Sequence, residues 1–494
     1  MPGSSRWSPP WAIGAAAVAV LCSLAVTAPA HAEADDQARA AAALHEQLRR
    51  IGSPNAAYAV LDGDRVVTGE SGDASQDTPF VIGSLSKSFT AVGVMRAVEA
   101  GLVHLDTPAT TYLPEFTTAS PAGKDITVTH LLHHTSGLST TDGVRDLLHP
   151  DRTLADRVAR TRDFELIAPP GQKFEYSNLN YAVLGLLLEK VSGRSYSEYL
   201  RDEVLAPIGL TSTVLDVAKA REQGLAAGSV PWFGWWSMPR PESEFPGALP
   251  DGYIVSTARD LAAYARFHLG DGRGAAGQVL SAQSMAALHE GIQSTGDTDP
   301  TSTGYAMGWY TGESESHPVI RHEGDNFGYR SDIALYPDLD RAIVVLIARN
   351  GTLSMAGSPV SAALPALAGG APALRSTYTV AGAAVLGSVA ALALTIGGAL
   401  LVHRRRAHRQ RPPSRAFAVA TILIAVLLAA SAFTTALLLV GGRITELPLI
   451  WRSAPDVMIL LIAWPTALIA IGSTSLTQRR RQANRRQGTR RGPG

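Results

Sequence analysis

Three apolar stretches near the C-terminus constrain this 494-residue chain more strongly than any other feature of its sequence. They cover residues 378–402, 416–441 and 456–474, and each is close to the length of about 20 residues with which a helix crosses a bilayer. None of them has Asp, Glu, Lys or Arg in its middle, where transporters and proton relays usually carry ionisable groups. We therefore predict a three-helix membrane anchor over residues 378–476.

The arginines predict how these helices are oriented. Six Arg lie between Arg404 and Arg415, after the first stretch, and seven lie between Arg479 and Arg491, after the third. Because Lys and Arg accumulate in the cytoplasmic loops of membrane proteins, both segments are predicted to be cytoplasmic. Residues 477–494 then form a basic cytoplasmic tail, and the large body that precedes the helices lies outside the cell.

The N-terminus leads to the same orientation. Arg6 precedes an apolar run from Trp11 to Val26, and Ala30-His31-Ala32 has the small residues of a cleavage site. We predict a secretory signal peptide over residues 1–32, an exported body over 33–370 and a linker over 371–377. An uncleaved anchor helix is the alternative, and it is disfavoured because the apolar run is short for a membrane span.

Composition and spacing exclude several classes of function. Cys22 is the only cysteine and lies in the predicted signal peptide, so thiol catalysis, disulfides and cysteine-ligated zinc are excluded. Residues 33–374 carry 26 Lys and Arg against 41 Asp and Glu, and this net charge of −15 argues against nucleic-acid binding. His133 and His134 have no further ligands at zinc spacing, so a packing role is expected. We predict no metal and no cofactor, and the sequence does not indicate the oligomeric state.

The periodicity of the body predicts an α+β fold. Two hairpins are expected, one of 56–61 with 65–68 and one of 331–336 with 341–348, because turn residues separate short runs of strand-forming residues. Helical spacing recurs between these hairpins and before the first of them, over residues 36–50, 84–100, 179–192, 195–205 and 258–269. The stretch 294–303 reads as a polar loop, and a short closing helix is expected within 357–374. Strands at both ends predict an antiparallel sheet that the N- and C-terminal strands close, with flanking helices.

An aromatic cluster, Trp232 to Trp236, lies in a Pro-rich segment. It could line an acyl pocket, enter the membrane interface or pack as ordinary loop core. The sequence leaves these three interpretations open.

Ser84 and Lys87 are the first candidates for chemistry. They lie at the start of a helical pattern, and residues three apart share one face of a helix. A lysine close to a serine in a partly dry site is kept neutral enough to take the serine proton. This spacing alone is weak evidence, since chance supplies it in most long chains. Ser86 is expected to lie behind the site, as a partner for the start of the helix.

Two further groups strengthen the case. Tyr176 near a lysine ammonium would have a lowered pKa and accept a proton, and Asn178 would donate to a substrate carbonyl. The alternatives are a core aromatic for Tyr176 and a helix cap for Asn178. At a predicted strand end, His322 precedes Gly324, and the glycine would let a substrate approach the backbone closely.

The order and spacing of the three groups resemble the serine beta-lactamase and penicillin-binding-protein superfamily, in which S-x-x-K, [SY]-x-N and K-T-G or H-x-G elements line one site. The class C beta-lactamase-like branch is the most similar, because the middle element begins with Tyr. Further stretches that fit this branch are Leu131–Leu138, Pro170–Tyr181, Leu184-Gly185, Pro207–Leu210, Ser256–Leu261 and Gly308-Trp309. The resemblance spans roughly residues 54–351 and leaves the membrane helices outside.

The resemblance implies a fold and a set of roles. The fold would include an all-helical insert beside the sheet. Ser84 would attack a carbonyl, Lys87 and Tyr176 would exchange its proton, and Asn178 would orient the substrate. The backbone N–H groups of Ser84 and Asp325 would form an oxyanion hole. The sequence does not decide whether Lys87 or Tyr176 is the base.

His322 occupies the position of the family lysine. A histidine is mostly neutral near pH 7, so this departure favours esterase or peptidase chemistry over efficient beta-lactam hydrolysis. We predict a membrane-anchored, extracytoplasmic serine hydrolase that acts through a Ser84 acyl-enzyme on an ester, an amide or a D-amino-acid peptide. The alternatives are a true beta-lactamase and a non-catalytic envelope protein that binds peptidoglycan or penicillin. The predicted partners are a small-molecule or peptide substrate and the membrane, with no nucleic acid.

Overall fold

The computed structural model describes residues 35–374, except 233–235, 241–243, 298 and 352–357, together with isolated residues between 387 and 481. The predicted signal peptide lies outside these residues, as do the predicted membrane helices and cytoplasmic tail apart from the isolated ones. Among the residues described, no helix combines the length and the apolar character that a membrane span requires.

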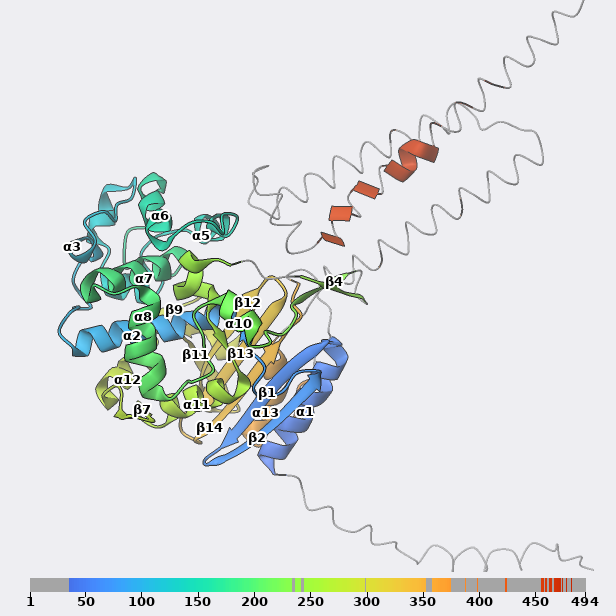
Figure 1. Ribbon diagram of the computed structural model, residues 1–494, viewed down its shortest axis with the longest axis horizontal. Coiled ribbons are helices and arrows are strands. Elements are labelled where there is room, and N and C mark those ends of the chain that lie inside the picture. Colours follow the sequence, from blue (N-terminus) through green and yellow to red (C-terminus); the bar gives the residue numbers. More distant parts are fainter. Residues whose placement is uncertain are drawn as a thin grey trace, which may run out of the picture.

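The body is built on an antiparallel sheet whose eight described strands lie in the order β2-β1-β14-β13-β12-β11-β10-β9 (Figure 1). These strands are β1 (Asn55–Asp62), β2 (Arg65–Gly72), β9 (Gln293–Ser294), β10 (Gly304–Tyr305), β11 (Tyr310–Ser314), β12 (His317–Asn326), β13 (Tyr329–Tyr336) and β14 (Arg341–Ile347). Both predicted hairpins are present. Ala56 in β1 pairs with Ile347 in β14, so N- and C-terminal strands meet in the sheet as predicted.

Six short strands form three two-stranded sheets outside the main one. They are β3 (Phe80–Val81) with β6 (Val255–Ser256), β4 (Ser229–Trp232) with β5 (Trp236–Pro239), and β7 (Arg273–Gly274) with β8 (Gly277–Gln278). The β4–β5 hairpin contains part of the aromatic cluster. Trp236 is 59% exposed there, so the interpretation as loop core is wrong for this residue.

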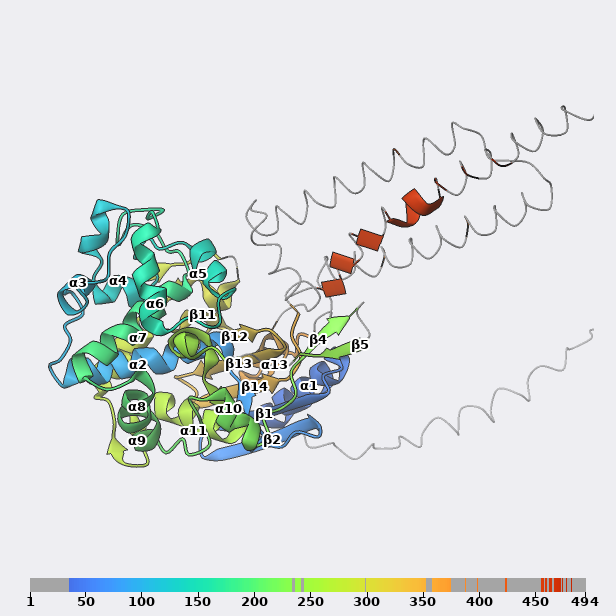
Figure 2. The ribbon, with the colours of Figure 1, turned by 45° about the horizontal axis from the view of Figure 1, so that its top comes forward.

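Helices cover both faces of the sheet (Figures 1 and 2). The helices are α1 (Asp36–Ile51), α2 (Ser86–Glu99), α3 (Ala109–Tyr112), α4 (Val128–Leu132), α5 (Thr140–Asp146), α6 (Leu154–Ala159), α7 (Asn178–Ser192), α8 (Tyr196–Leu200), α9 (Ala206–Ile208), α10 (Val217–Glu222), α11 (Ala258–Leu269), α12 (Ala282–His289) and α13 (Pro359–Leu367). Short 3-10 turns are η1 (Gly83–Leu85), η2 (Pro121–Asp125), η3 (Arg160–Asp163), η5 (Pro246–Ala248) and η7 (Pro300–Ser302), and π turns are η4 (Arg201–Leu205) and η6 (Leu249–Tyr253).

The sheet separates two apolar cores. Helices α1 and α13 pack on one face, where Leu44 and Leu364 meet Val345 of β14. The larger core lies on the other face and contains Phe89 of α2 and Leu261 of α11. Both faces of β14 are therefore buried, which explains why its sequence is continuously apolar rather than alternating.

Local signals explain where α1 begins and ends. The Asp35 carboxylate accepts a hydrogen bond from the backbone N–H of Ala38, which satisfies one of the free donors of the first turn. The helix ends at Gly52, whose φ of 63° is left-handed. The prediction of a helix over 36–50 is confirmed.

Between β3 and β4 the described chain is helical, and this insert lies beside the sheet (Figure 2). Helix α2 is buried almost all round, so it is the central helix of the body. Residues 195–205 are helical as predicted, since α8 continues directly into a π turn that ends at Leu205. One prediction needs correction. The predicted loop 294–303 contains the end of β9 and the turn η7.

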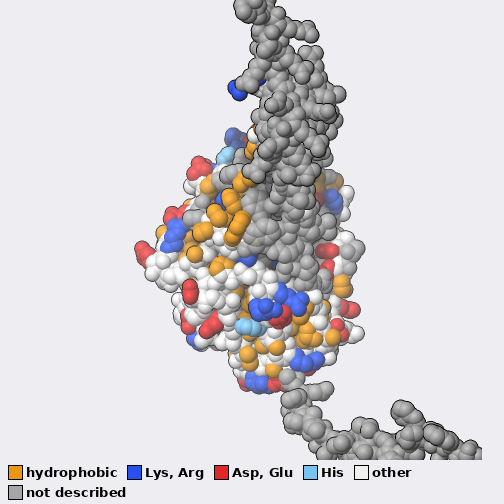
Figure 3. Space-filling view, turned by 90° about the vertical axis from the view of Figure 1, so that its right-hand side faces the viewer, with side chains coloured by type: hydrophobic (Ala, Val, Ile, Leu, Met, Phe, Trp, Pro, Cys, Tyr) orange, Lys and Arg blue, Asp and Glu red, His pale blue; other side chains and the backbone are white. Residues whose placement is uncertain are grey.

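Acidic and basic side chains are interspersed on the face of the body shown in Figure 3. In the described part of that face, the net negative charge of the body is not gathered into a single patch.

Candidate active site

Ser84 lies in the η1 turn between β3 and α2, and β12 packs tightly against this turn. A Cβ atom on Gly324 would lie 1.9 Å from the carbonyl oxygen of Ile82, and one on Gly83 would lie 2.7 Å from the backbone nitrogen of Asp325. Gly83 also has a left-handed φ of 53°. On the side where a Cβ would stand, the backbone that approaches Gly324 is therefore the chain's own, and the role of this glycine toward a substrate stays a prediction.

This close packing brings the η1 turn beside Asp325. The Ser331 hydroxyl donates to the Ile82 carbonyl at 2.6 Å and ties β13 to the same turn. The backbone amides of Ser84 and Asp325 thus come from two elements that are locked together, as an oxyanion hole requires. Their role as that hole stays a prediction.

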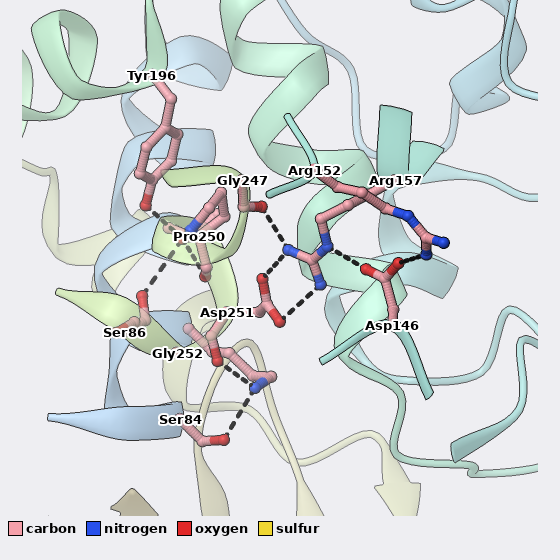
Figure 4. A network of polar contacts seen from close by, with 12 residues as sticks. Ser84, Ser86, Asp146, Arg152, Arg157, Tyr196, Gly247, Pro250, Asp251 and Gly252 are labelled. Carbon is pink, nitrogen blue, oxygen red and sulfur yellow. Dashed lines mark hydrogen bonds and ion pairs between the residues drawn. The ribbon is translucent and has the colours of Figure 1, made fainter. Parts of the chain in front are cut away.

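Lys87 is completely buried beside Ser84. Its Nζ donates to Ser84 Oγ at 3.0 Å and to the carbonyl oxygen of Asp251 at 2.6 Å (Figure 4). Burial lowers the pKa of Lys87 to about 7, with Asp251 raising it and Arg157 lowering it further. A lysine in this state is half neutral near pH 7, so it is able to accept the serine proton.

Ser86 has a structural role, as expected. Its hydroxyl donates to the Gly83 carbonyl at 2.7 Å and accepts from the N–H of Ile254 at 3.2 Å. It therefore fixes the η1 turn and the segment that carries Asp251.

Tyr176 lies over Lys87, whose Nζ is 4.9 Å from the centre of the tyrosine ring. Burial raises the pKa of Tyr176 well above its usual value; Tyr310 adds to this, while a hydrogen bond with Ser84 opposes it. The predicted lowering of this pKa is wrong, because the loss of water outweighs the nearby lysine. Tyr176 is a neutral phenol here, and Lys87 is the group with the lowered pKa.

Asn178 is the first residue of α7. Ser177 occupies the cap position, and no side chain caps this helix, so the helix-cap alternative for Asn178 is wrong. Its Oδ1 atom is buried without a hydrogen-bond partner among the described residues. The predicted role of Asn178 in orienting a substrate stays a prediction.

His322 is buried in β12 and uses both ring nitrogens. Nδ1 lies 2.6 Å from the carbonyl of Glu323, an acceptor, so the proton sits on Nδ1. Nε2 then accepts from the Tyr305 hydroxyl at 3.2 Å. Burial, helped by Lys87 and Arg321, lowers the pKa of His322 to about 3. The ring is therefore neutral at physiological pH.

His133 and His134 form hydrogen bonds within the protein. Asn180 Nδ2 lies 2.8 Å from Nδ1 of His134, and this nitrogen also accepts from the N–H of Ser177 at 3.2 Å. His133 Nδ1 lies 3.3 Å from the carbonyl of Tyr305. His134 packs 4.4 Å from Tyr176, ring centre to ring centre, so it supports that tyrosine. In the part of the chain that the structure describes, no three His, Cys, Asp or Glu side chains are grouped to hold a metal.

Asp251, which accepts a hydrogen bond from Lys87 through its backbone carbonyl, was not found by sequence reasoning. The segment around it is held at successive residues: Thr90 donates to the Pro250 carbonyl at 2.7 Å, and Asn326 to the Gly252 carbonyl at 3.2 Å. A backbone carbonyl has no residue-specific signal, so only the fold reveals this contact.

Comparisons with known proteins identify the family of this chain. The chain matches the Beta-lactamase family over residues 38–366 and belongs to that family. The wider class is the superfamily of serine beta-lactamases and penicillin-binding proteins, as the sequence motifs predicted.

Two curated relatives show the range of similarity. Penicillin-binding protein 4 of Amycolatopsis lactamdurans is 31% identical over 317 residues, which cover 60% of this chain and 81% of that protein. Protein flp of Staphylococcus aureus is 27% identical over 304 residues, which cover 59% of this chain and 56% of flp. The match thus spans little more than half of flp.

Solved structures share the fold. A penicillin-binding protein homologue from Pyrococcus abyssi, described as octameric, has a TM-score of 0.60 and 25% identity, covering 68% of this chain and 78% of that one. A class C beta-lactamase from Rhodobacter sphaeroides has a TM-score of 0.55 and 22% identity, covering 67% and 98%. A D-stereospecific amidohydrolase from Streptomyces has a TM-score of 0.53 and 22% identity, covering 63% and 94%.

Proposed function

We propose that this protein is a membrane-anchored, extracytoplasmic serine hydrolase that forms an acyl-enzyme at Ser84. The single observation that carries the proposal is the 3.0 Å contact between Lys87 Nζ and Ser84 Oγ at a completely buried lysine. Burial removes water from around the lysine and so disfavours its charged form. A neutral amine beside a serine hydroxyl can take the hydroxyl proton, which activates the serine as a nucleophile.

The acylation step follows from this contact. Neutral Lys87 takes the proton of Ser84, and the serine oxygen bonds to the substrate carbonyl carbon. The oxyanion that forms accepts hydrogen bonds from the backbone N–H groups of Ser84 and Asp325. When the bond to the leaving group breaks, the proton passes from Lys87 to the leaving group by way of the Tyr176 phenol. Water then attacks the ester carbonyl carbon while Lys87 takes the water proton. When the bond to the Ser84 oxygen breaks, this proton passes from Lys87 to Ser84 and the acid product leaves.

The raised pKa of Tyr176 supports this division of roles. A phenol that stays protonated is suited to relay a proton, whereas Lys87, with a pKa of about 7, is suited to accept one. We therefore assign the base to Lys87 in the acylation step.

His322 favours an ester, an amide or a D-amino-acid peptide whose binding does not depend on a cation at a carboxylate, rather than a beta-lactam. A neutral ring whose nitrogens are both occupied offers no positive charge to a substrate carboxylate. The name of penicillin-binding protein 4 states that this relative binds penicillin, so binding of penicillin by the present chain is included in the test below.

The location is proposed from the sequence. A signal peptide and three membrane helices with cytoplasmic arginines would hold the body at the outer face of the membrane, beside the cell wall. A phosphatase fused after residue 374 should be active, and one fused after Arg411 inactive. The reverse pattern would overturn the orientation.

The activity is tested with the full-length chain in detergent, alongside Ser84→Ala and Ser88→Ala. Ser88 is the matched control, since its buried hydroxyl bonds to the Leu85 carbonyl and Tyr264, away from Ser84. The substrates are a short-chain nitrophenyl ester, a D-Ala-D-Ala peptide and nitrocefin, and the labels are a fluorophosphonate and a fluorescent penicillin.

The proposal expects wild type and Ser88→Ala to be labelled and to cleave the ester or the peptide, and Ser84→Ala to do neither. Nitrocefin turnover without ester or peptide cleavage would instead support a beta-lactamase. Labelling by penicillin with no turnover would support a binding protein. A wild-type chain that reacts with no probe would refute the proposal.

A further inference from the structure

A buried ion-pair network lies directly behind Lys87. Arg157 of α6 has no exposed surface, and its guanidinium contacts both carboxylate oxygens of Asp251, at 2.6 and 3.0 Å (Figure 4). The same guanidinium donates to Asp146 and to the carbonyl of Gly247. Arg152 completes the network with a contact of 2.8 Å to Asp146. The reaction described above assigns no proton transfer to any member of this network.

Asp251 joins this network to the active site, because its backbone carbonyl and its side-chain carboxylate contact different partners. Its carbonyl accepts from Lys87, whereas its carboxylate is held by Arg157. Gly247 and Asp251 mark the two ends of the segment that crosses behind Lys87, and Arg157 binds both. A shift of the guanidinium would therefore move the carbonyl that Lys87 donates to.

We propose that Arg157 is a positioning residue for Lys87: it orients the Asp251 carbonyl toward the lysine and neutralises the Asp251 carboxylate behind it. The inference rests on the proposed function, because it concerns the group that activates Ser84. Neither Arg157 nor Asp251 would touch the substrate.

The charge of the network explains why a pair is needed. An unpaired Asp251 carboxylate close to Lys87 would favour the ammonium form, and an unpaired Arg157 would favour the neutral amine. The two charges oppose each other, and burial has the largest effect on the pKa of Lys87. The ionisable groups around Lys87 are Asp251, Arg157, Tyr176, Tyr181, His134 and His322. The two histidines are neutral and the tyrosines protonated, which leaves Asp251 and Arg157 as the charged members of this group.

Stability alone does not account for such a pair. Replacing a buried ion pair by apolar side chains of similar volume is often neutral or stabilising, because both charges lose their hydration. A pair that also fixes a carbonyl against the catalytic lysine has a separate function. This is the role that the test must isolate.

The test is the pH profile of kcat/KM for nitrophenyl ester hydrolysis by the full-length chain. The acidic limb of this profile reports the ionisation of the base in the free enzyme. The variants are Asp251→Asn, Arg157→Met and the double variant. Arg152→Met is the matched control, because Arg152 belongs to the same network but contacts only its outer carboxylate, Asp146.

The two single variants should move the acidic limb of the kcat/KM profile in opposite directions. Asp251→Asn removes an anion and shifts it to lower pH, and Arg157→Met leaves Asp251 unpaired and shifts it to higher pH, each by roughly one unit or more. The double variant, again without net charge, should return the limb near its wild-type pH while kcat stays low, because the carbonyl is no longer held. Arg152→Met should keep the wild-type limb.

Each result decides the matter. If the two single variants lower kcat but leave the acidic limb in place, or both shift it in the same direction, the Arg157–Asp251 pair is only structural. The inference is then overturned. If Arg157→Met does not fold, the shift in Asp251→Asn and its reversal in the double variant decide. A wild-type chain with neither ester turnover nor Ser84 labelling would refute the proposed function, and the role of Arg157 with it. If the wild-type chain hydrolyses the ester but the acidic limb of the variants stays at the wild-type pH, only the inference is refuted.

Discussion

Gly324→Ala tests the packing that brings the η1 turn and β12 together. The added Cβ would lie 1.9 Å from the Ile82 carbonyl oxygen and 2.4 Å from Ser331 Oγ, where ordinary contacts begin at 3.4 Å. One of the two backbones must therefore shift by more than 1 Å, on the order of the difference between these distances. The hydrogen bond between Ser331 and Ile82 would be displaced as well.

The magnitude follows from these two losses. Overpacking costs about 1–3 kcal/mol, and a lost hydrogen bond about 1 kcal/mol, so the free energy of unfolding should fall by about 2–4 kcal/mol. The backbone amide of Asp325 adjoins the glycine, so the predicted oxyanion hole would also open. Loss of one such donor lowers kcat by about 100- to 1000-fold.

Urea unfolding measures the first effect and ester hydrolysis the second. Gly252→Ala is the control for stability, since its Cβ meets no atom within 4 Å and should change the free energy of unfolding by less than about 0.5 kcal/mol. A Gly324→Ala variant with the stability and the kcat of the wild type would refute the reasoning.

Four further predictions concern Lys87, Tyr176, Arg157 and two buried histidines. Lys87→Met should lower kcat/KM by about 100- to 10,000-fold while the chain still folds, because the base is lost and a neutral side chain suits the buried site; activity within tenfold of wild type would contradict this. Tyr176→Phe should lower kcat more than it changes KM, since the phenol acts on the leaving group; a change in KM alone would count against the relay. Arg157→Met should lower the free energy of unfolding by about 3–5 kcal/mol, because the buried Asp251 carboxylate loses its partner and Asp146 keeps only Arg152, and Arg157→Met/Asp251→Asn should recover part of this in urea unfolding. Acid should destabilise the fold between pH 6.5 and 4: His133 and His322 are neutral when folded, with pKa values lowered by burial to about 4 and about 3, whereas the unfolded chain takes up protons near 6.5. Burial raises the pKa of Asp332 to about 7, so this carboxyl opposes the two histidines in part of the same range. A urea midpoint at pH 5 that equals or exceeds the one at pH 7 would contradict the predicted sign.

The sequence predicted those features whose cause is local. The two hairpins were found because turn residues separate short strands, and Ser84 and Lys87 were placed together because helical residues three apart share a face. The 3.0 Å contact between these two side chains agrees with that geometry.

Features whose cause lies far away in the chain were missed or misread. The pKa of Tyr176 was assigned the wrong sign, because its degree of burial depends on rings from several elements. The close approach of Ile82 to Gly324 was not foreseen, because these two residues lie far apart in the sequence. Asp251 and Arg157 could not be found at all, since one acts through its backbone and the other through a partner.

The central claim is tested most directly by identifying the acylated residue. The full-length chain is mixed with a nitrophenyl ester, quenched in acid during the first turnover, digested and mapped by mass spectrometry. The account predicts an acyl group on the peptide that contains Ser84, in amounts that approach one per chain, and none in Ser84→Ala. An acyl group on another residue, or ester turnover that persists in Ser84→Ala, would contradict it.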